Sequence, residues 1–350
     1  MSKVGQCVDA DGTEKTYVSS DTLLASLFQL SSASSSSVSV THSASTLLQQ
    51  NKRILRFSSG SLAFNSLLTV NASDPGVGGL TQGSLLELSG APGEGKTRSC
   101  ISFAINVCLT HSEAHGLPTV LIIDTQGSIP MSELYEAAVS ACDGEPKAVF
   151  ETLDQIVLWT STERDDMLAA LYVLPHWLNA NPSVKLVILD SLTSPLSAYL
   201  VPALSSQIIN EQEISDKCQH SSKKRRTNPG LPGFANQDAA HSLIRTLLAT
   251  VLKKTLLTLS ARKVSVIVTT QSKTKLTDDF GENATLKEAK HSFAVPQFTN
   301  FWHIPDTTQI VLSAGPAGVR TAMATVAPSI SKGKTICFRT TTAGIADLSA

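Results

Sequence analysis

A short stretch in the first third of the chain has the residue types and spacing of a phosphate-binding loop. Residues 90–97 read GAPGEGKT and match the pattern G-x-x-x-x-G-K-[ST] between an apolar strand and an amphipathic helix. Its glycines let backbone N–H groups turn toward phosphate oxygens, and the helix start adds the positive end of its dipole. In this pattern Lys96 reaches the β- and γ-phosphates and Thr97 holds Mg²⁺. The stretch predicts a nucleotide site formed by Gly90, Ala91, Pro92, Gly93, Glu94, Gly95, Lys96 and Thr97.

A second candidate element is an apolar strand that ends in a carboxylate. Residues 186–190 read LVILD, and a buried strand would place Asp190 at the carboxyl edge of the sheet, beside the phosphate loop. From there Asp190 could orient a water on Mg²⁺. An Asp at a strand end is also a common turn former, so its metal role depends on the loop upstream.

Strands and helices alternate along most of the chain and must position these residues. The alternation predicts an α/β fold whose mainly parallel sheet is flanked by helices, with C-terminal antiparallel hairpins added to it. The expected strands are 84–89, 119–123, 156–159, 184–189, 264–269, 308–312, 320–326 and 335–339; the expected helices are 22–30, 96–109, 131–141, 163–178 and 239–260.

Composition narrows the protein class. The 350 residues are 42% hydrophobic and 16% charged, which is typical of a globular protein, and the net charge of −1 means that any nucleic-acid site must be local. The six cysteines have no C-x-x-C spacing, so we expect free thiols and no zinc site. No apolar run reaches membrane-spanning length, which predicts that the chain is not an integral membrane protein. The serine-dominated residues 31–45 predict a flexible segment.

Further segments follow the loop in a characteristic order. They are IIDTQGS at 122–128, LVILDSLTSPL at 186–196, VIVTTQ at 266–271, VPQFTNFWHIPDTTQIVL at 295–312 and AGIAD at 343–347. Together with GAPGEGKT this set resembles the RecA-type recombinases, and among them the eukaryotic recombinase paralogues that assist strand-exchange filaments in homologous recombination. The likeness covers roughly residues 58–348.

The resemblance implies a RecA-like P-loop NTPase core that binds ATP and Mg²⁺ between neighbouring subunits, with two loops lining a DNA channel. It also implies that Gln271 senses the γ-phosphate and passes its state to the second DNA loop, which starts at Ser272. We expect a core at 58–348 and a flexible, Ser-rich N-terminal appendage at 1–57. That appendage is shorter than the helical N-terminal domain of the main recombinases.

The chain departs from the family pattern at two sites. Active recombinases carry a glutamate where this chain has Gln126, and an amide can orient water but cannot accept its proton. Losing a positioned base typically lowers a rate by about 10² to 10⁴, so we expect firm ATP binding and slow hydrolysis. The family's cap over a neighbour's ATP has an acidic residue before a Ser-Pro pair, whereas this chain reads Val326-Ala327-Pro328. This difference favours a heteromeric partner over a symmetric homofilament.

Two basic segments are candidate single-stranded DNA contacts. The first DNA loop contains an insert at about 205–236, expected to be a solvated loop, with the cluster Lys223, Lys224, Arg225 and Arg226. That cluster fits a nuclear-import signal, a phosphate contact or a merely solvated charge run. The second loop has Lys273, Lys275, Lys287 and Lys290, with Phe293 as a stacking surface, a combination that suits single-stranded DNA.

These features predict a nuclear, ATP-dependent mediator of homologous recombination and DNA repair. The residues expected to act on nucleotide are Lys96, Gln126, Asp190 and Gln271, and the expected partners are single-stranded DNA and another recombinase paralogue or the main recombinase. Two alternatives stay open: a self-assembling, DNA-stimulated strand-exchange ATPase, and a P-loop scaffold or kinase with no DNA role.

Overall fold

The computed structural model describes the chain as two separate units, Met1–Arg53 and Ile54–Ala350. The described residues are 4–8, 14–18, 55–69, 78–111, 116–200, 246, 249–279, 290–297, 304, 307–326 and 332–348. In the first unit, β1 (Val4–Val8) pairs with β2 (Glu14–Val18) in antiparallel fashion. The predicted helix at 22–30, the Ser-rich segment and the insert at 205–236 lie outside the described residues.

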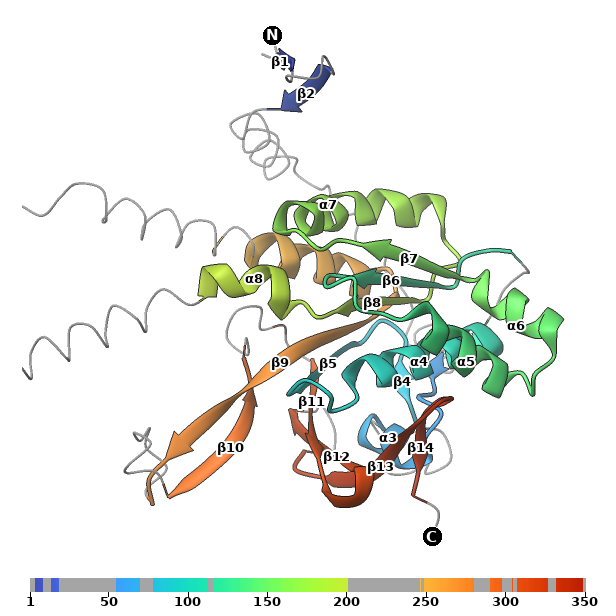
Figure 1. Ribbon diagram of the computed structural model, residues 1–350, viewed down its shortest axis with the longest axis vertical. Helices are drawn as coiled ribbons and strands as arrows, with labels where there is room; N and C mark the ends of the chain where they lie inside the picture. The colour runs from blue at the N-terminus through green and yellow to red at the C-terminus, as the bar shows by residue number, and fades with distance from the viewer. Residues whose placement is uncertain are drawn as a thin grey trace, which may run out of the picture. The chain divides into compact units, whose positions relative to one another are not determined.

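The second unit is built on a ten-stranded sheet with the order β14-β13-β12-β11-β5-β9-β8-β6-β7, and β10 pairs with β9 off this path (Figure 1). The strands from β11 to β7 are parallel, while β12, β13 and β14 are antiparallel. The bounds are β5 (Leu85–Gly90), β6 (Val120–Asp124), β7 (Ile156–Thr160), β8 (Leu186–Asp190), β9 (Ser265–Thr277), β10 (His291–Pro296), β11 (Thr308–Ala314), β12 (Val319–Val326), β13 (Thr335–Thr341) and β14 (Gly344–Asp347). A small separate pair joins β3 (Arg56–Phe57) to β4 (Leu80–Thr81).

Helices cover both faces of this sheet (Figure 1). Helices on one face include α4 (Lys96–His111) and α5 (Met131–Ala141), and those on the other include α7 (Arg164–Ala180) and a helix at 249–261. The remaining helices are α3 (Leu62–Leu67), α6 (Pro146–Leu153), α8 (Thr193–Leu200) and the 3-10 turn η2 (Pro316–Gly318). Among the described helices, none is long and apolar enough to cross a membrane.

The central strands are apolar on both sides because both sides are covered. In β6, Val120 and Ile122 join the core beneath α4, while Leu121 and Ile123 join the core beneath α7. Successive strand residues point to opposite faces, so a continuous apolar run fills two cores at once. The predicted α/β fold with C-terminal antiparallel strands is therefore confirmed.

Three features of the fold differ from the sequence prediction. The strand expected to end at 269 continues to Thr277, and the helices α3, α6 and α8 and the strand β14 are additional. The helix expected at 239–260 is described as helical at 246 and 249–261, and its other predicted residues lie outside the described part. The extension of β9 has the largest consequence, because it carries part of the expected second DNA loop.

Candidate functional site

The phosphate loop forms the turn between β5 and α4, as its sequence predicts. Gly93 and Gly95 have positive φ angles of 81° and 94°, a backbone region that favours glycine. At Gly95 a Cβ would lie 2.9 Å from the Cγ2 of Thr340 on β13. Glycine at position 95 therefore allows both the backbone conformation of the turn and the close approach of β13.

The Lys96 side chain folds back onto the phosphate loop. Its Nζ donates hydrogen bonds to the carbonyl oxygens of Gly90 (2.8 Å) and Ala91 (2.9 Å). Burial lowers the pKa of the Lys96 ammonium, and the nearby carboxylates of Glu94 and Asp190 oppose that shift. To bind a phosphate, the Lys96 ammonium would give up its hydrogen bonds to the two backbone carbonyls and donate to phosphate oxygens instead.

Asp190 contacts the first turn of α4 directly. The Thr97 hydroxyl donates to Asp190 Oδ2 (2.9 Å), and the Thr269 hydroxyl donates to Oδ1 (2.5 Å). Burial raises the pKa of Asp190, its hydrogen bonds from Thr269 and Thr97 lower it, and the adjacent Asp124 raises it further. Hydroxyl and carboxylate oxygens are the ligands that Mg²⁺ prefers, so the pair Thr97 and Asp190 fits the predicted ion. Among the described residues, no group of three or more His, Cys, Asp or Glu could hold a metal by itself.

Gln126 lies on a loop that is anchored beside Asp190. The register pairs Asp124, at the end of β6, with Asp190, at the end of β8. The buried Asp124 carboxylate accepts the backbone N–H groups of Gln126 (3.0 Å) and Ile129 (2.8 Å). The Gln126 side chain is exposed, so it is presented to solvent at the same sheet edge as the phosphate loop.

Gln271 lies next to the start of the phosphate loop. The strand β9 runs between β5 and β8, and its register pairs Gln271 with Gly90. The backbone N–H of Gln271 donates to the Thr193 hydroxyl of α8 (3.3 Å). One sheet edge thus brings together the four residues predicted to act on nucleotide: Lys96, Gln126, Asp190 and Gln271.

The expected second DNA loop is partly an antiparallel arm. Beyond Gln271, β9 pairs with β10 from Ser272 to Thr277, and Figure 1 shows the two strands leaving the sheet together. Lys273 is exposed, and Lys275 pairs in register with Phe293. Lys290 immediately precedes β10 at the end of the arm away from Gln271, where its backbone N–H donates to the Thr277 carbonyl (2.9 Å). Lys287 and the basic cluster at 223–226 lie outside the described residues.

Three residues at this sheet edge have positions or contacts that were not predicted from sequence: Glu94, Arg320 and Asp124. The N–H of Ala91 donates to the Glu94 carboxylate (2.5 Å), which is one of the charges close to Lys96. Arg320 of β12 donates to the Gly93 carbonyl (3.2 Å). Asp124 carries the same signal as Asp190, since VLIID and LVILD are both apolar strands ending in a carboxylate. No local pattern marks Arg320.

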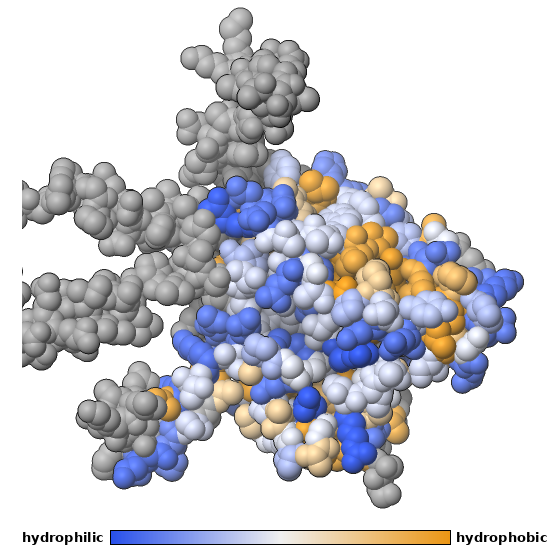
Figure 2. Space-filling model, viewed as in Figure 1, coloured by the Kyte–Doolittle hydropathy of each residue, from blue (hydrophilic) through white to orange (hydrophobic). Residues whose placement is uncertain are grey.

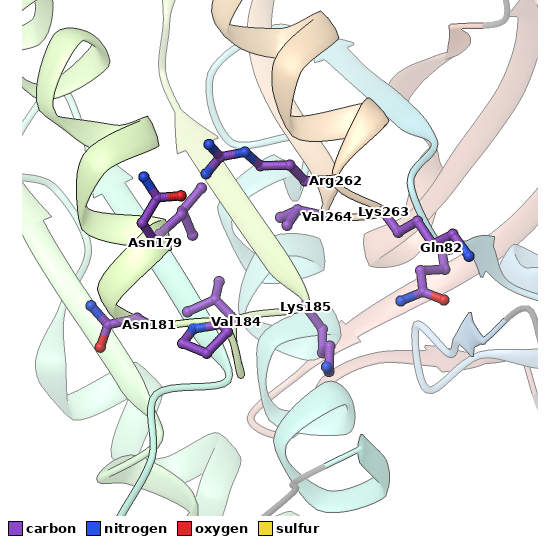
Figure 3. Close-up of a pocket in the computed structure, with 10 residues that line it drawn as sticks. Gln82, Asn179, Asn181, Val184, Lys185, Arg262, Lys263 and Val264 are labelled. Carbon is purple, nitrogen blue, oxygen red and sulfur yellow. The ribbon is translucent and has the colours of Figure 1, made fainter. Parts of the chain in front are cut away.

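A pocket of roughly 370 Å³ lies elsewhere, at the amino ends of the parallel strands (Figure 3). It is lined by Lys185, Arg262 and Lys263 together with amides that include Gln82 and Asn181. Arg262 and Lys263 follow the helix at 249–261, where cations satisfy the negative end of a helix dipole. Because the phosphate loop follows the carboxyl end of β5, this pocket is not part of the candidate nucleotide site.

The curated proteins that the chain resembles include relatives with recombination or repair names. The chain is 31% identical over 150 residues to the DNA repair and recombination protein RadA of Metallosphaera sedula, covering 43% of each chain. It is 26% identical to the DNA repair protein RAD51 homolog 3 of Cricetulus griseus (38% of this chain, 43% of the relative). It is 32% identical to the DNA repair protein RAD51 homolog 2 of Homo sapiens (36% of this chain, 34% of the relative).

The matches span less than half the length of these curated relatives. No protein-family model matches the chain. The ordered motifs, the parallel sheet with its C-terminal antiparallel strands and the named relatives nevertheless point the same way: over part of its length, the chain is similar to recombination and repair proteins of the RadA and RAD51 type.

Proposed function

We propose that this protein is an ATP-binding recombinase paralogue that assists the assembly of strand-exchange filaments in homologous recombination. Its relatives support a role in DNA repair and recombination. The observation that carries the proposal is the convergence of the phosphate loop, Asp190 and Gln271 at one sheet edge, where β9 continues directly into a lysine-bearing arm.

Nucleotide binding would use the loop and the residues around it. Backbone N–H groups at the start of α4 would hold phosphate oxygens, and Lys96 would turn from its two loop carbonyls to the β- and γ-phosphates. Thr97 and Asp190 would hold Mg²⁺, the latter through water; the ion neutralises phosphate charge when bound. The buried Asp190 is already oriented by Thr269, so little reorganisation is needed.

Hydrolysis would be slow because Gln126 replaces the general base. Asp124 holds its backbone in place, so an attacking water could be oriented at this position. The amide cannot accept the water's proton, which typically lowers a rate by about 10² to 10⁴. Slow turnover would keep the nucleotide-bound state, and with it the assembly, in place.

The nucleotide state would reach DNA through β9. Gln271 is next to Gly90, and Lys273 and Lys275 follow on the same strand. Alternate residues of a strand share a face, so these three residues line one side of β9. A shift of Gln271 toward the γ-phosphate would move lysines that can contact the backbone of single-stranded DNA.

A partner subunit would complete the assembly. The strand β7 is the last of the parallel strands and its residues are only partly buried. Figure 2 shows apolar surface where β7, α5 and α6 lie in Figure 1, and the exposed apolar side chains of these helices include Met131, Tyr135 and Phe150. This surface suits a recombinase paralogue or the main recombinase as a heteromeric partner. Because such a partner acts on chromosomal DNA, the proposed localisation of this protein is the nucleus.

The test is single-stranded DNA binding over a salt series, with and without ATP and Mg²⁺, for the chain alone and with recombinase subunits. We expect binding that requires ATP, is lost in Lys96→Ala and is retained in Lys254→Ala, since Lys254 is an exposed residue of the helix at 249–261. Lys273→Ala/Lys275→Ala should reduce the slope of log affinity against log salt by about 1.4, or about 0.7 per phosphate contact. The control Lys253→Ala/Lys254→Ala, on the helix at 249–261, should leave the slope unchanged.

The alternatives predict different outcomes in the same experiment. Strong DNA-stimulated turnover with self-assembly and no partner would select a strand-exchange ATPase. Tight nucleotide binding without DNA binding under any partner or salt condition would select a scaffold or kinase role.

A further inference from the structure

A buried carboxylate lies in the strand that leads into the phosphate loop. Glu87 is 1% exposed and sits in the middle of β5, three positions before Gly90. The Thr270 hydroxyl of β9 donates to its Oε1 (2.8 Å), and the Gln309 side-chain amide of β11 donates to its Oε2 (2.9 Å). One side chain therefore links three adjacent strands, and both of its partners are also buried.

The hydrogen bond between Glu87 and Thr270 lies next to two residues of the candidate nucleotide site. Thr270 immediately precedes Gln271, and the register pairs Ser89 with Thr270 and Gly90 with Gln271. The carboxylate thus ties β5 to β9 beside the end of β5, where the phosphate loop begins, and beside the point where β9 continues into the β9–β10 arm. A core leucine would avoid the desolvation cost of burying a carboxylate but could not hold Thr270 by a hydrogen bond.

We propose that Glu87 is a positioning residue of the nucleotide site: through Thr270 it fixes the part of β9 that leaves the parallel sheet, and with it Gln271 and the arm, against the strand that carries the phosphate loop. This inference rests on the proposed nucleotide function. Glu87 does not touch the phosphate loop itself; it acts on the strand whose movement would report the nucleotide.

The ionisation of Glu87 makes the link sensitive to pH near neutrality. Burial raises the pKa of Glu87 to about 7, although the hydrogen bonds from Thr270 and Gln309 lower it. No charged side chain contributes to this shift in the pKa of Glu87. The described charged residues on β9 and directly after it all follow Gln271, on the arm: Lys273, Lys275, Asp278 and Asp279. His291 of β10 also lies on the arm, and β11 (308–314) carries no charged residue. On the covering helix at 249–261, Lys253 and Lys254 are exposed, while leucines 252, 256 and 259 are buried in the core on that face.

The test follows backbone hydrogen exchange in peptides covering 268–279 and 290–297, with and without Mg²⁺ and adenylyl imidodiphosphate. The variants are Glu87→Gln and Thr270→Val, and the matched control is Ser89→Ala, a buried polar residue of β5 whose hydroxyl bonds to the Ile310 carbonyl instead (3.4 Å). We expect the analogue to slow exchange in the arm of the wild type and of Ser89→Ala. Glu87→Gln and Thr270→Val should bind the analogue within about twofold of wild type but lose most of that slowing.

A second readout uses the nucleotide-free protein. If opening of β9 around Thr270 exposes Glu87 to water, opening should rise about tenfold from pH 6 to pH 8 after correction for intrinsic exchange, given pKa values near 4.5 and 7 in the open and closed states. Glu87→Gln should show no such rise. This readout needs no nucleotide, so a wild type that fails to bind the analogue would overturn the proposed function while the pH profile still decides the role of Glu87.

The inference would be overturned if Glu87→Gln kept the wild-type nucleotide response in the arm. It would also be overturned if the variant lost protection uniformly across the whole sheet, or if its pH profile matched that of the wild type. Each of these results would make Glu87 an ordinary core residue.

Discussion

The buried carboxylate of Glu87 leads to a quantitative prediction for the stability of the whole core. The pKa of Glu87 in the folded state is about 7, against 4.5 for a glutamate side chain in water, and burial is the main cause of the difference. Between these values the folded state keeps a proton that the unfolded state has lost, so the free energy of unfolding falls as pH rises. At about 1.36 kcal/mol per pKa unit, the full effect is about 3 kcal/mol.

Within the practical range from pH 5.5 to pH 8, this linkage amounts to about 2 kcal/mol. Many other carboxyl groups titrate as well, so the relevant quantity is the difference between wild type and Glu87→Gln at each pH. The glutamine carries no charge, and Gln309 can rotate its amide to offer an oxygen in place of a nitrogen. Glu87→Gln should therefore gain about 2 kcal/mol relative to wild type from pH 5.5 to pH 8.

The assay is urea unfolding followed by circular dichroism at several pH values, with Ser89→Ala as the control for a buried polar change on the same strand. The control should stay at a constant offset from wild type. A difference between Glu87→Gln and wild type that is the same at pH 5.5 and pH 8 would refute the reasoning, because Glu87 would then titrate alike in the folded and unfolded chain.

Four further predictions concern the nucleotide site and the C-terminal strand. Lys96→Ala should weaken ATP binding by about 100-fold or more, measured by calorimetry, because charge-assisted contacts to phosphate are lost; equal affinity would exclude this loop as the site. Glu94→Gln should tighten ATP binding about threefold, since a carboxylate near Lys96 is neutralised; weaker binding would contradict this. Gln126→Glu should raise steady-state hydrolysis by about 10² or more, unless wild-type turnover already matches an active recombinase. Asp347 accepts the Ser61 hydroxyl and the N–H groups of Leu62 (2.9 Å) and Ala63 (3.0 Å) at the start of α3, so Asp347→Ala should lower the free energy of unfolding by about 1 kcal/mol, and an unchanged urea midpoint would rule that cap out.

The phosphate loop and Asp190 could be predicted from sequence because their signals are local. Glycine spacing describes the turn itself, and an apolar run ending in a carboxylate describes a buried strand that reaches the sheet edge. The same signal occurs at Asp124, which was not singled out because it lies beside the more conspicuous Gln126. Gln271 could be placed only by its resemblance to the family, since a lone amide after a strand has no chemical signature.

Other contacts could not be predicted because they join distant segments. Arg320 meets Gly93 across more than 200 residues, and no periodicity marks it. The arm was expected as a loop since residues 272–277 read SKTKLT, a polar run whose strand character depends on pairing with β10. The basic cluster at 223–226 and residues 327–328 lie outside the described residues, so the import, DNA-contact and cap hypotheses for these segments remain predictions.

The central claim is that ATP in the phosphate loop controls single-stranded DNA binding through Gln271. The most direct measurement is the affinity for a fluorescent single-stranded oligonucleotide, with and without Mg²⁺-ATP, for wild type and Gln271→Ala at one salt concentration in the presence of the partner subunit. We predict that ATP tightens DNA binding of the wild type at least about tenfold, or about 1.4 kcal/mol, and that Gln271→Ala binds ATP equally well but gains no DNA affinity from it. An equal gain in both proteins, or no gain in the wild type, would contradict the claim.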